Sequence, residues 1–281
     1  MDTVTRKGFR ISQVLIYASL ILAAIICLLP IVVVLLGAFK TGPEFQQSGV
    51  WELPDSFLNF ENFKTAFTKG KMLLSFMNTI FILFFSILAT VLTGTMTAYI
   101  LNRFRFKGRN LVNNLFLVAS LIPSITMQMS VFQIITKLGL FNTRWATIIL
   151  FAGTDIISIY IFVQFLENIS TALDESAIVD GASYWTIFSR ILLPLLKPAV
   201  VTVIIIKGVG FYNEFYTPFL YMPSSKLAVI STALFKFRGP FSSQWEVICA
   251  GVIITIIPTL IIFLALQKQI YQGMTQGSVK E

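Results

Sequence analysis

Long apolar runs separated by short polar segments make up most of the chain. Residues 14–36, VLIYASLILAAIICLLPIVVVLL, are one example. About 20 apolar residues suffice for a helix to cross a bilayer, whereas the strands of a membrane barrel alternate apolar and polar positions. Because the runs do not alternate, the pattern predicts an all-α, polytopic membrane protein with six transmembrane helices, at 14–38, 73–100, 110–135, 144–166, 198–220 and 247–267.

Individual residues within the predicted spans refine this pattern. Pro123 interrupts the third span, and Lys207 lies within the fifth. In the second span Thr90, Gly94 and Ala98 recur at every fourth position. Small residues at that spacing allow the backbones of neighbouring helices to approach closely. The second span is therefore expected to be tightly packed.

The basic residues indicate how the chain is oriented in the membrane. An even number of spans places both termini on one side, and cytoplasmic segments carry an excess of Lys and Arg. RKGFR precedes the first span, and the loop after the second contains Arg103, Arg105, Lys107 and Arg109. We therefore expect cytoplasmic termini, in a single transmembrane domain that covers residues 1–281.

The composition agrees with a membrane protein and argues against other classes. Of the 281 residues, 56% are hydrophobic and 12% are charged, against about 25% charged in typical soluble domains. The net charge of +8 is interpreted as cationic flanks facing anionic lipid headgroups rather than as a nucleic-acid site. Histidine is absent, and Cys27 and Cys249 lie in apolar runs without metal-type spacing. We therefore expect no catalytic residue, no metal site and no cofactor bound by this chain, and hence no enzyme.

One acidic segment, LDESAIVDGASYWTIFSRILLP at residues 173–194, separates the fourth and fifth spans. It carries Asp174, Glu175 and Asp180 between two long apolar runs. Short helices are only marginally stable alone in water, so helices in this segment must pack against something. The residues leave two alternatives open, which are docking on the protein's own spans and insertion into a partner subunit.

Local signals within this segment predict two short helices at an angle. Thr171 and Asp174 have the spacing of a capping box, so a first helix is expected to start there. Gly181 is expected to break that helix, as glycine often does. Ser183 is a candidate cap for a second helix, which is expected to end by Pro194.

The same segment resembles the EAA loop of binding-protein-dependent ABC importer permeases. That pattern is Glu-Ala-Ala, three residues, Gly, about nine residues and then Ile-x-Leu-Pro, and a serine replaces one alanine here. Further similarity to the carbohydrate-uptake branch, and to its MalG-like second permease subunit, lies in TAYILNRFRFKGR, LIPSITMQMSVFQIITKLGLFNT, GFYNEFYTPF and QKQIYQGMTQGSVKE. The resemblance implies that this loop couples the permease to an ATPase. The residues that carry the pattern or lie within it are Asp174, Glu175, Ser176, Ala177, Asp180, Gly181, Ile191 and Pro194.

The resemblance implies a type I ABC importer permease fold in a prokaryotic plasma membrane. Residues 167–197 would form a cytoplasmic coupling loop. The implied partners are a second homologous permease, two ATP-binding cassette subunits and an extracytoplasmic solute-binding protein, with a carbohydrate as substrate. ATP and Mg²⁺ would be bound by the partner, since this chain has no G-x-x-x-x-G-K-[ST] motif.

Polar residues within the spans are candidates for contact with substrate, because ionisable groups inside a membrane are rare and often functional. Asp155 and Lys207 are hypothesised to pair across the bundle, where they would line the pathway or stabilise two states. Alternatively, Lys207 snorkels to the interface or the fifth span is shifted along the sequence. The remaining candidates offer planar hydrogen-bonding groups or aromatic rings, which suit sugars, and are Tyr212, Asn213, Glu214, Tyr216 and Gln128.

Other transport functions are the alternatives. An ABC permease for amino acids or osmolytes would share the coupling loop, but the segment QGMTQGSVKE argues against it. An ion-coupled secondary transporter often shows internal repeats, and the sequence has no clear repeat. The sequence therefore favours the sugar importer and leaves the sugar open.

Overall fold

The computed structural model describes residues 3–153, 155–239 and 243–276. Within these residues every regular element is a helix, which confirms the predicted all-α class. The chain divides into two compact units: unit 1 is Met1–Met72 with Leu234–Leu260, and unit 2 is Leu73–Ala233 with Ile261–Glu281. The end of the QGMTQGSVKE segment, from residue 277, lies outside the described residues.

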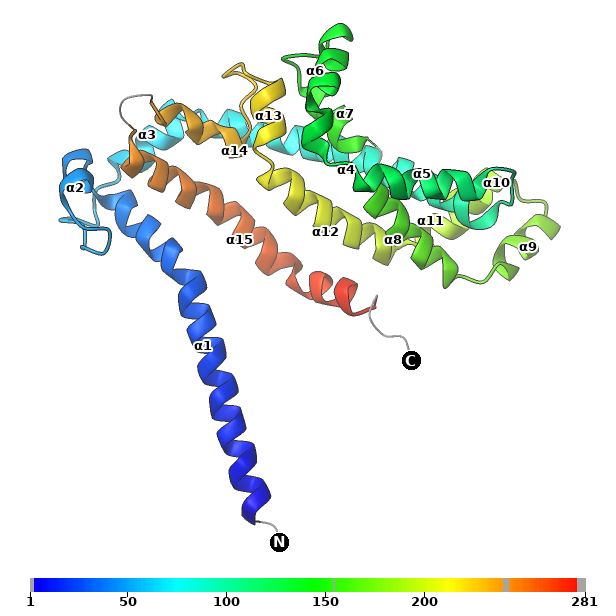
Figure 1. Cartoon of the computed structure of the whole chain (residues 1–281), viewed down its shortest axis with the longest axis horizontal. Coiled ribbons are helices and arrows are strands. Elements are labelled where there is room, and N and C mark those ends of the chain that lie inside the picture. The colour runs from blue at the N-terminus through cyan, green and yellow to red at the C-terminus, as the bar shows by residue number, and fades with distance from the viewer. Residues whose placement is uncertain (1–2, 154, 240–242, 277–281) are drawn as a thin grey trace. The chain divides into compact units, whose positions relative to one another are not determined.

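Unit 1 contains the first long helix and the elements that follow it. Its helices are α1 (Thr3–Phe39), α2 (Gly42–Gln47), α3 (Glu61–Lys69), η3 (Leu234–Phe237) and the first part of α15 (Trp245–Gln276) (Figure 1). Asn62 of α3 donates to the carbonyls of Ala38 and Lys40 at 2.9 and 2.7 Å. These bonds satisfy carbonyls at the end of α1 that lack partners within the helix.

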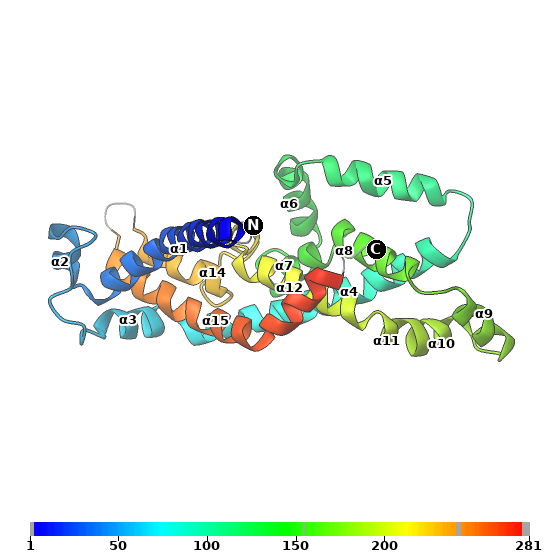
Figure 2. The same ribbon diagram turned by 90° about the horizontal axis from the view of Figure 1, so that it is seen from below.

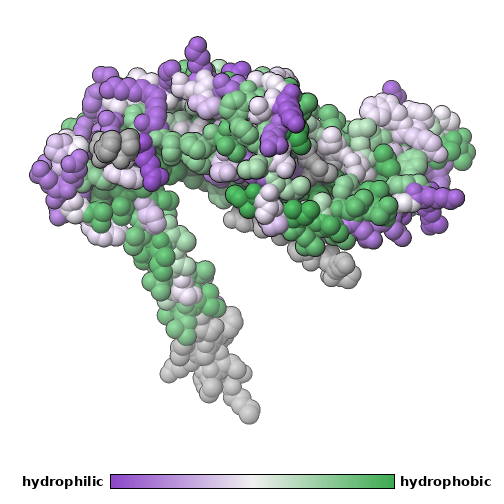
Figure 3. All heavy atoms as spheres, turned by 45° about the horizontal axis from the view of Figure 1, so that its top comes forward, coloured by the Kyte–Doolittle hydropathy of each residue, from purple (hydrophilic) through white to green (hydrophobic). Residues whose placement is uncertain are grey.

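From Gln13 onward the surface of α1 is mostly apolar, as the coloured part of this helix shows in the space-filling view (Figure 3). Residues 13–39 form an uninterrupted span, and only 11% of its most apolar window is buried. Leu15 and Tyr17 are each 65% exposed. Such a helix is stable only when lipid or another protein covers it, in keeping with a membrane protein.

Glu44 gives unit 1 a predicted pH dependence. Its carboxylate accepts hydrogen bonds from the backbone N–H groups of Thr41 at 3.0 Å and Asp55 at 2.8 Å. These bonds, chiefly that from Thr41, hold the pKa of Glu44 below its ordinary value of 4.5. Because the pKa of Glu44 is lower in the folded state, its ionised carboxylate stabilises the segment at pH values above the ordinary pKa. This stabilisation is lost as the pH falls through the lowered, folded-state pKa. We expect the amide hydrogen exchange of Thr41 and Asp55, corrected for intrinsic rates, to accelerate when the pH falls below the folded-state pKa of Glu44. In the Glu44→Gln variant the corrected exchange rates should not depend on pH.

Unit 2 contains the remaining helices (Figures 1 and 2). They are most of α4 (Met72–Arg103), α5 (Arg109–Leu121), η1 (Ser124–Met127), α6 (Gln128–Lys137), α7 (Arg144–Ala152), α8 (Ile156–Glu167), α9 (Ala172–Val179), α10 (Tyr184–Thr186), η2 (Ile187–Leu192), α11 (Leu193–Leu195), α12 (Lys197–Asn213), α13 (Tyr216–Tyr221) and α14 (Ile230–Ala233). Helices α12 and α8 pack against each other, and α5 also contacts α8.

Three of the six predicted spans are found as continuous helices. Gln13–Phe39, Met72–Arg103 and Trp245–Ala265 are long and apolar enough to cross a membrane. The third and fourth predicted spans are pairs of helices bent by 89° and 42°. The fifth begins with α12, which is bent by 70° from the preceding helix Tyr184–Leu195 of the acidic segment. The described residues therefore contain three spans, or six if each bent pair crosses as one.

Prolines explain two differences from the predicted spans, the break in the third span and the early end of the helix in the fifth. Pro123 disfavours helical geometry at Ile122, which is extended, and α5 therefore ends before it. The predicted fifth span was wrong at its end, because α12 stops at Asn213. Pro218 has no N–H for the carbonyl of Glu214, which instead accepts a hydrogen bond from the Ser231 hydroxyl at 2.7 Å.

The core of unit 2 joins its helices to the acidic segment. Buried side chains from α4, α8, α9, η2 and α12 form one cluster: Ala98, Tyr99, Phe162, Leu166, Ala177, Ile187, Phe188, Leu192, Leu196, Ala199 and Val203. In α4 the residues Thr90, Gly94 and Ala98 are all buried, as their spacing predicts. The acidic segment is therefore packed onto the spans of its own chain.

Candidate functional site

The acidic segment folds into two short helices joined by a tight turn. Helix α9 ends at Val179, and Gly181 follows with a φ of +82°. This left-handed conformation suits glycine and confirms the predicted break. The hydroxyl of Ser183 accepts a hydrogen bond from the backbone N–H of Thr186 at 3.2 Å, which confirms the predicted cap.

Two local predictions for this segment were wrong. Thr171 has helical backbone angles, and its side chain makes no capping hydrogen bond. The hydroxyl of Ser170 accepts from the N–H of Ala172 at 3.3 Å instead. The second helix does not end at Pro194, because α10 continues through the π-helical turn η2 into α11, which ends at Leu195. Pro194 is the second residue of α11 and follows directly after this π-helical turn.

An ion pair fastens the inner side of α9 to the end of α4. The Nε of Arg103 lies 2.7 Å from the Oδ2 of Asp174, and the two side chains are only 8% and 13% exposed. Arg103 also donates to the carbonyl of Ile169 at 2.7 Å. Ala177 is buried in the core cluster beside them. Of the predicted coupling residues, Asp174 and Ala177 therefore face the protein's own spans.

The outer side of the segment exposes large apolar side chains. Val179 is 87% exposed, Tyr184 60% and Trp185 64%. Among the predicted coupling residues, Ile191 is half-buried and the exposed ones are Glu175, Ser176, Asp180, Gly181 and Pro194. One segment thus combines a fixed inner side with an uncovered outer side. We call residues 167–197 the coupling loop from here on, after the role that the resemblance implies for them.

A second candidate site lies at the break between α7 and α8. The Nζ of Lys207 on α12 lies 2.6 Å from the Oδ1 of Asp155, and the hydroxyl of Ser158 bonds to the other carboxylate oxygen. The predicted pairing of these two residues is therefore present in the structure. Both charged side chains border a cavity of about 420 Å³.

The hydrogen bonds of the other candidate substrate residues are mostly local. Asn213 donates to the carbonyl of Val209 within α12 at 3.0 Å. The carboxylate of Glu214 accepts from the N–H of Thr217 at 3.0 Å, near the start of α13. Tyr212 lines a narrow void, and Tyr216 is 45% exposed. Gln128 donates to the Tyr221 hydroxyl at 3.1 Å.

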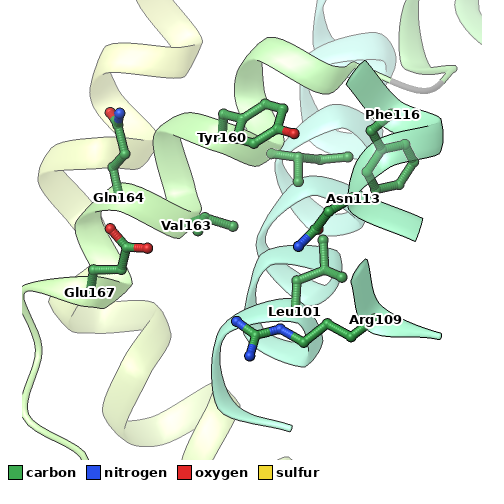
Figure 4. A pocket seen from close by; sticks show the side chains of 9 residues that line it. Leu101, Arg109, Asn113, Phe116, Tyr160, Val163, Gln164 and Glu167 are labelled. Atoms are coloured by element: carbon green, nitrogen blue, oxygen red, sulfur yellow. The ribbon is translucent and has the colours of Figure 1, made fainter. Parts of the chain in front are cut away.

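A further cavity, not expected from the sequence, lies between the ends of α4, α5 and α8 (Figure 4). It has a volume of about 280 Å³. Figure 4 shows Arg109 and Glu167 toward one end, with Tyr160 and Phe116 toward the other. Arg109 belongs to the basic loop that was interpreted only as a sign of topology. Among the described residues, no group of three or more Cys, Asp or Glu side chains could hold a metal ion.

Known proteins place the chain in a family. Residues 90–276 match the family of binding-protein-dependent transport system inner membrane components. The probable ABC transporter permease YurM of Bacillus subtilis is 32% identical over 98% of this chain and 91% of that protein. The arabinooligosaccharide permease AraQ of Halalkalibacterium halodurans is 28% identical, over 98% and 99%. One chain of a bacterial ABC transporter involved in importing the acidic polysaccharide alginate aligns with a TM-score of 0.81 at 22% identity, over 93% and 97%.

The family match and the relatives that align over most of the chain show an integral membrane permease of a transport system. The structural match shows that the fold is that of an ABC importer permease. The chain belongs to the family of binding-protein-dependent transport system inner membrane components, which confirms the resemblance found in the sequence. It is therefore an inner-membrane transport subunit, and the secondary-transporter alternative is not supported.

Proposed function

We propose that this chain is the MalG-like permease subunit of an ATP-driven importer for a sugar or oligosaccharide. It pairs with a second homologous permease in a prokaryotic plasma membrane, with both termini in the cytoplasm. Two ATP-binding subunits bind ATP and Mg²⁺ and carry out hydrolysis, and an extracytoplasmic solute-binding protein delivers the sugar. Its family and the arabinooligosaccharide permease that it resembles support this proposal.

The main support for the proposal is that the coupling loop is anchored to the spans on its inner side and exposes apolar side chains on its outer side. Val179, Tyr184 and Trp185 are uncovered, and exposed aromatic side chains are typical anchors of protein interfaces. The Arg103–Asp174 pair fastens the opposite side of the loop to α4. A segment held rigidly on one side transmits a partner's movement to the spans better than a flexible tether does. The occupant of the outer side is, on this proposal, an ATP-binding subunit.

Co-purification of the tagged chain with its co-expressed partners in mild detergent tests this proposal. We expect the double variant Val179→Ser, Trp185→Ser to lose the ATP-binding subunit and retain the second permease, because its apolar anchors are gone. Leu58→Ser is the matched control, since Leu58 is 82% exposed and lies outside the coupling loop. It should retain both partners.

Two results would contradict the proposal. Equal recovery of the ATP-binding subunit by the coupling-loop variant and by Leu58→Ser would mean that the ATPase docks elsewhere. Uptake by the intact chain that follows an ion gradient and needs no ATP would restore the secondary-transporter alternative. Competition of labelled sugar uptake by unlabelled amino acids would instead favour the alternative ABC permease.

A further inference from the structure

The break between α7 and α8 places irregular backbone within a predicted span. Helix α7 ends at Ala152, Gly153 is extended with a ψ of 175°, and α8 begins at Ile156. Within a bilayer, irregular backbone is tolerated only where protein buries it or where it lines a water-filled cavity. Here Gly153 and Asp155 border the cavity of about 420 Å³. The break therefore has the placement of a solute site rather than of a packing defect.

The charged groups of this cavity balance one another. The carboxylate of Asp155 contacts the ammonium of Lys207 through one oxygen and the hydroxyl of Ser158 through the other. The two charged side chains are 11% and 17% exposed, and among the described residues that line this cavity they are the only ionisable ones. The cavity wall is thus polar and carries no net charge. An unpaired charge at this depth would be costly, which explains why the two residues are paired.

Aromatic rings supply the apolar side of the same cavity. Phe151 and Phe211 stack with their centroids 4.4 Å apart and their planes inclined by 3°. Both rings line the cavity, and both also line the narrow void beside Tyr212. The stacked pair therefore forms a wall between the two spaces. Small-ligand sites typically combine such apolar walls with a few fixed polar groups.

We propose that this cavity contacts the sugar during transport and that the Asp155–Lys207 pair makes it selective for neutral over acidic sugars. The inference rests on the proposed function and specifies its substrate class. Hydroxyls of a neutral sugar bond to both charged groups while the pair stays intact. A uronate carboxylate would compete with Asp155 for Lys207 and leave one of the two carboxylates unpaired. That repulsive element is the kind of device that gives binding sites specificity.

The proposal is tested by measuring direct binding of sugars to the purified transporter complex. The solute-binding protein is left out, because it would itself select between the sugars. The probes are a neutral α-1,4-linked glucose trisaccharide and an α-1,4-linked galacturonate trisaccharide of similar size. We expect the wild-type complex to prefer the neutral probe. In Asp155→Asn, Lys207 is uncompensated, and affinity for the galacturonate probe should rise by about tenfold or more relative to the neutral one.

A double variant separates charge selection from a purely structural role. Asp155→Asn with Lys207→Met removes both charges, so its relative affinity for the galacturonate probe should fall below that of Asp155→Asn. Phe211→Ala should weaken binding of the neutral probe, whereas Phe84→Ala, which changes an aromatic side chain that is 61% exposed on α4, should not.

The proposal is overturned if Asp155→Asn leaves the ratio of the two affinities unchanged. It is equally overturned if neither trisaccharide binds to the wild-type complex or to either charge variant. ATP hydrolysis by each complex and recovery of its ATP-binding subunit are measured in parallel. If the wild-type complex neither hydrolyses ATP nor retains an ATP-binding subunit, the proposed function itself is contradicted. If it does both and the selectivity is unchanged in Asp155→Asn, only this inference is contradicted.

Discussion

Arg103→Ala is expected to lower sugar uptake by about tenfold or more, with a large loss of stability. The substitution removes the partner of Asp174, whose side chain is only 13% exposed, and the donor to the carbonyl of Ile169. Removing one member of a buried ion pair typically costs about 3–5 kcal/mol, because the remaining charge stays buried and uncompensated. The coupling loop would then be free to move without moving α4. Thermal unfolding of the purified complex and sugar transported per ATP hydrolysed measure the two effects.

The control for this prediction is Arg105→Ala. Arg105 belongs to the same basic loop and is exposed, so its removal changes the topology-determining charge by the same amount. The double variant Arg103→Leu, Asp174→Leu should recover part of the lost stability, since no charge remains buried. If Arg103→Ala and Arg105→Ala behaved alike, the charge of the loop would matter and its attachment to Asp174 would not.

The sequence predicts those features that depend on neighbouring residues. Apolar runs locate the spans because any helix exposed to lipid must be apolar along its length. The turn at Gly181 follows from a glycine between two helical segments, and the cap at Ser183 from a hydroxyl that precedes the next helix. The assignment to the importer permeases rested on the same local segment, residues 173–194.

Features that depend on distant residues were harder to predict. Arg103 counted as one of four basic residues in its loop, and nothing local shows that its partner is Asp174. The contact of Gln128 with Tyr221 was missed for the same reason. The pairing of Asp155 with Lys207 was predictable because an isolated charge within a span needs an opposite charge, which leaves few choices. The Thr171 cap failed because its backbone is already helical, so its hydroxyl does not take the capping position.

Phe162→Ala is expected to be the most destabilising substitution in the core of unit 2, at about 3–5 kcal/mol. The Phe162 side chain is fully buried between α4, α8 and the coupling loop. Gly94 of α4 lies directly against it, since a Cβ at Gly94 would be 3.0 Å from Cε2 of the ring. Gly94→Leu should therefore also destabilise, by about 1–3 kcal/mol, because the larger side chain would push against this fully buried ring. The midpoint of thermal unfolding of the purified complex measures both losses.

The two substitutions should compensate each other, which distinguishes close packing from a general intolerance of change. Phe162→Ala leaves a cavity that the leucine of Gly94→Leu can partly fill, so the double variant should be more stable than the sum of the single effects predicts. Gly210→Leu on α12 is the control, because a Cβ at Gly210 would meet no atom within 4 Å. Strictly additive losses would show that Gly94 and Phe162 act independently. Compensation would show that contact between α4 and α8 holds together the helices that carry the coupling loop.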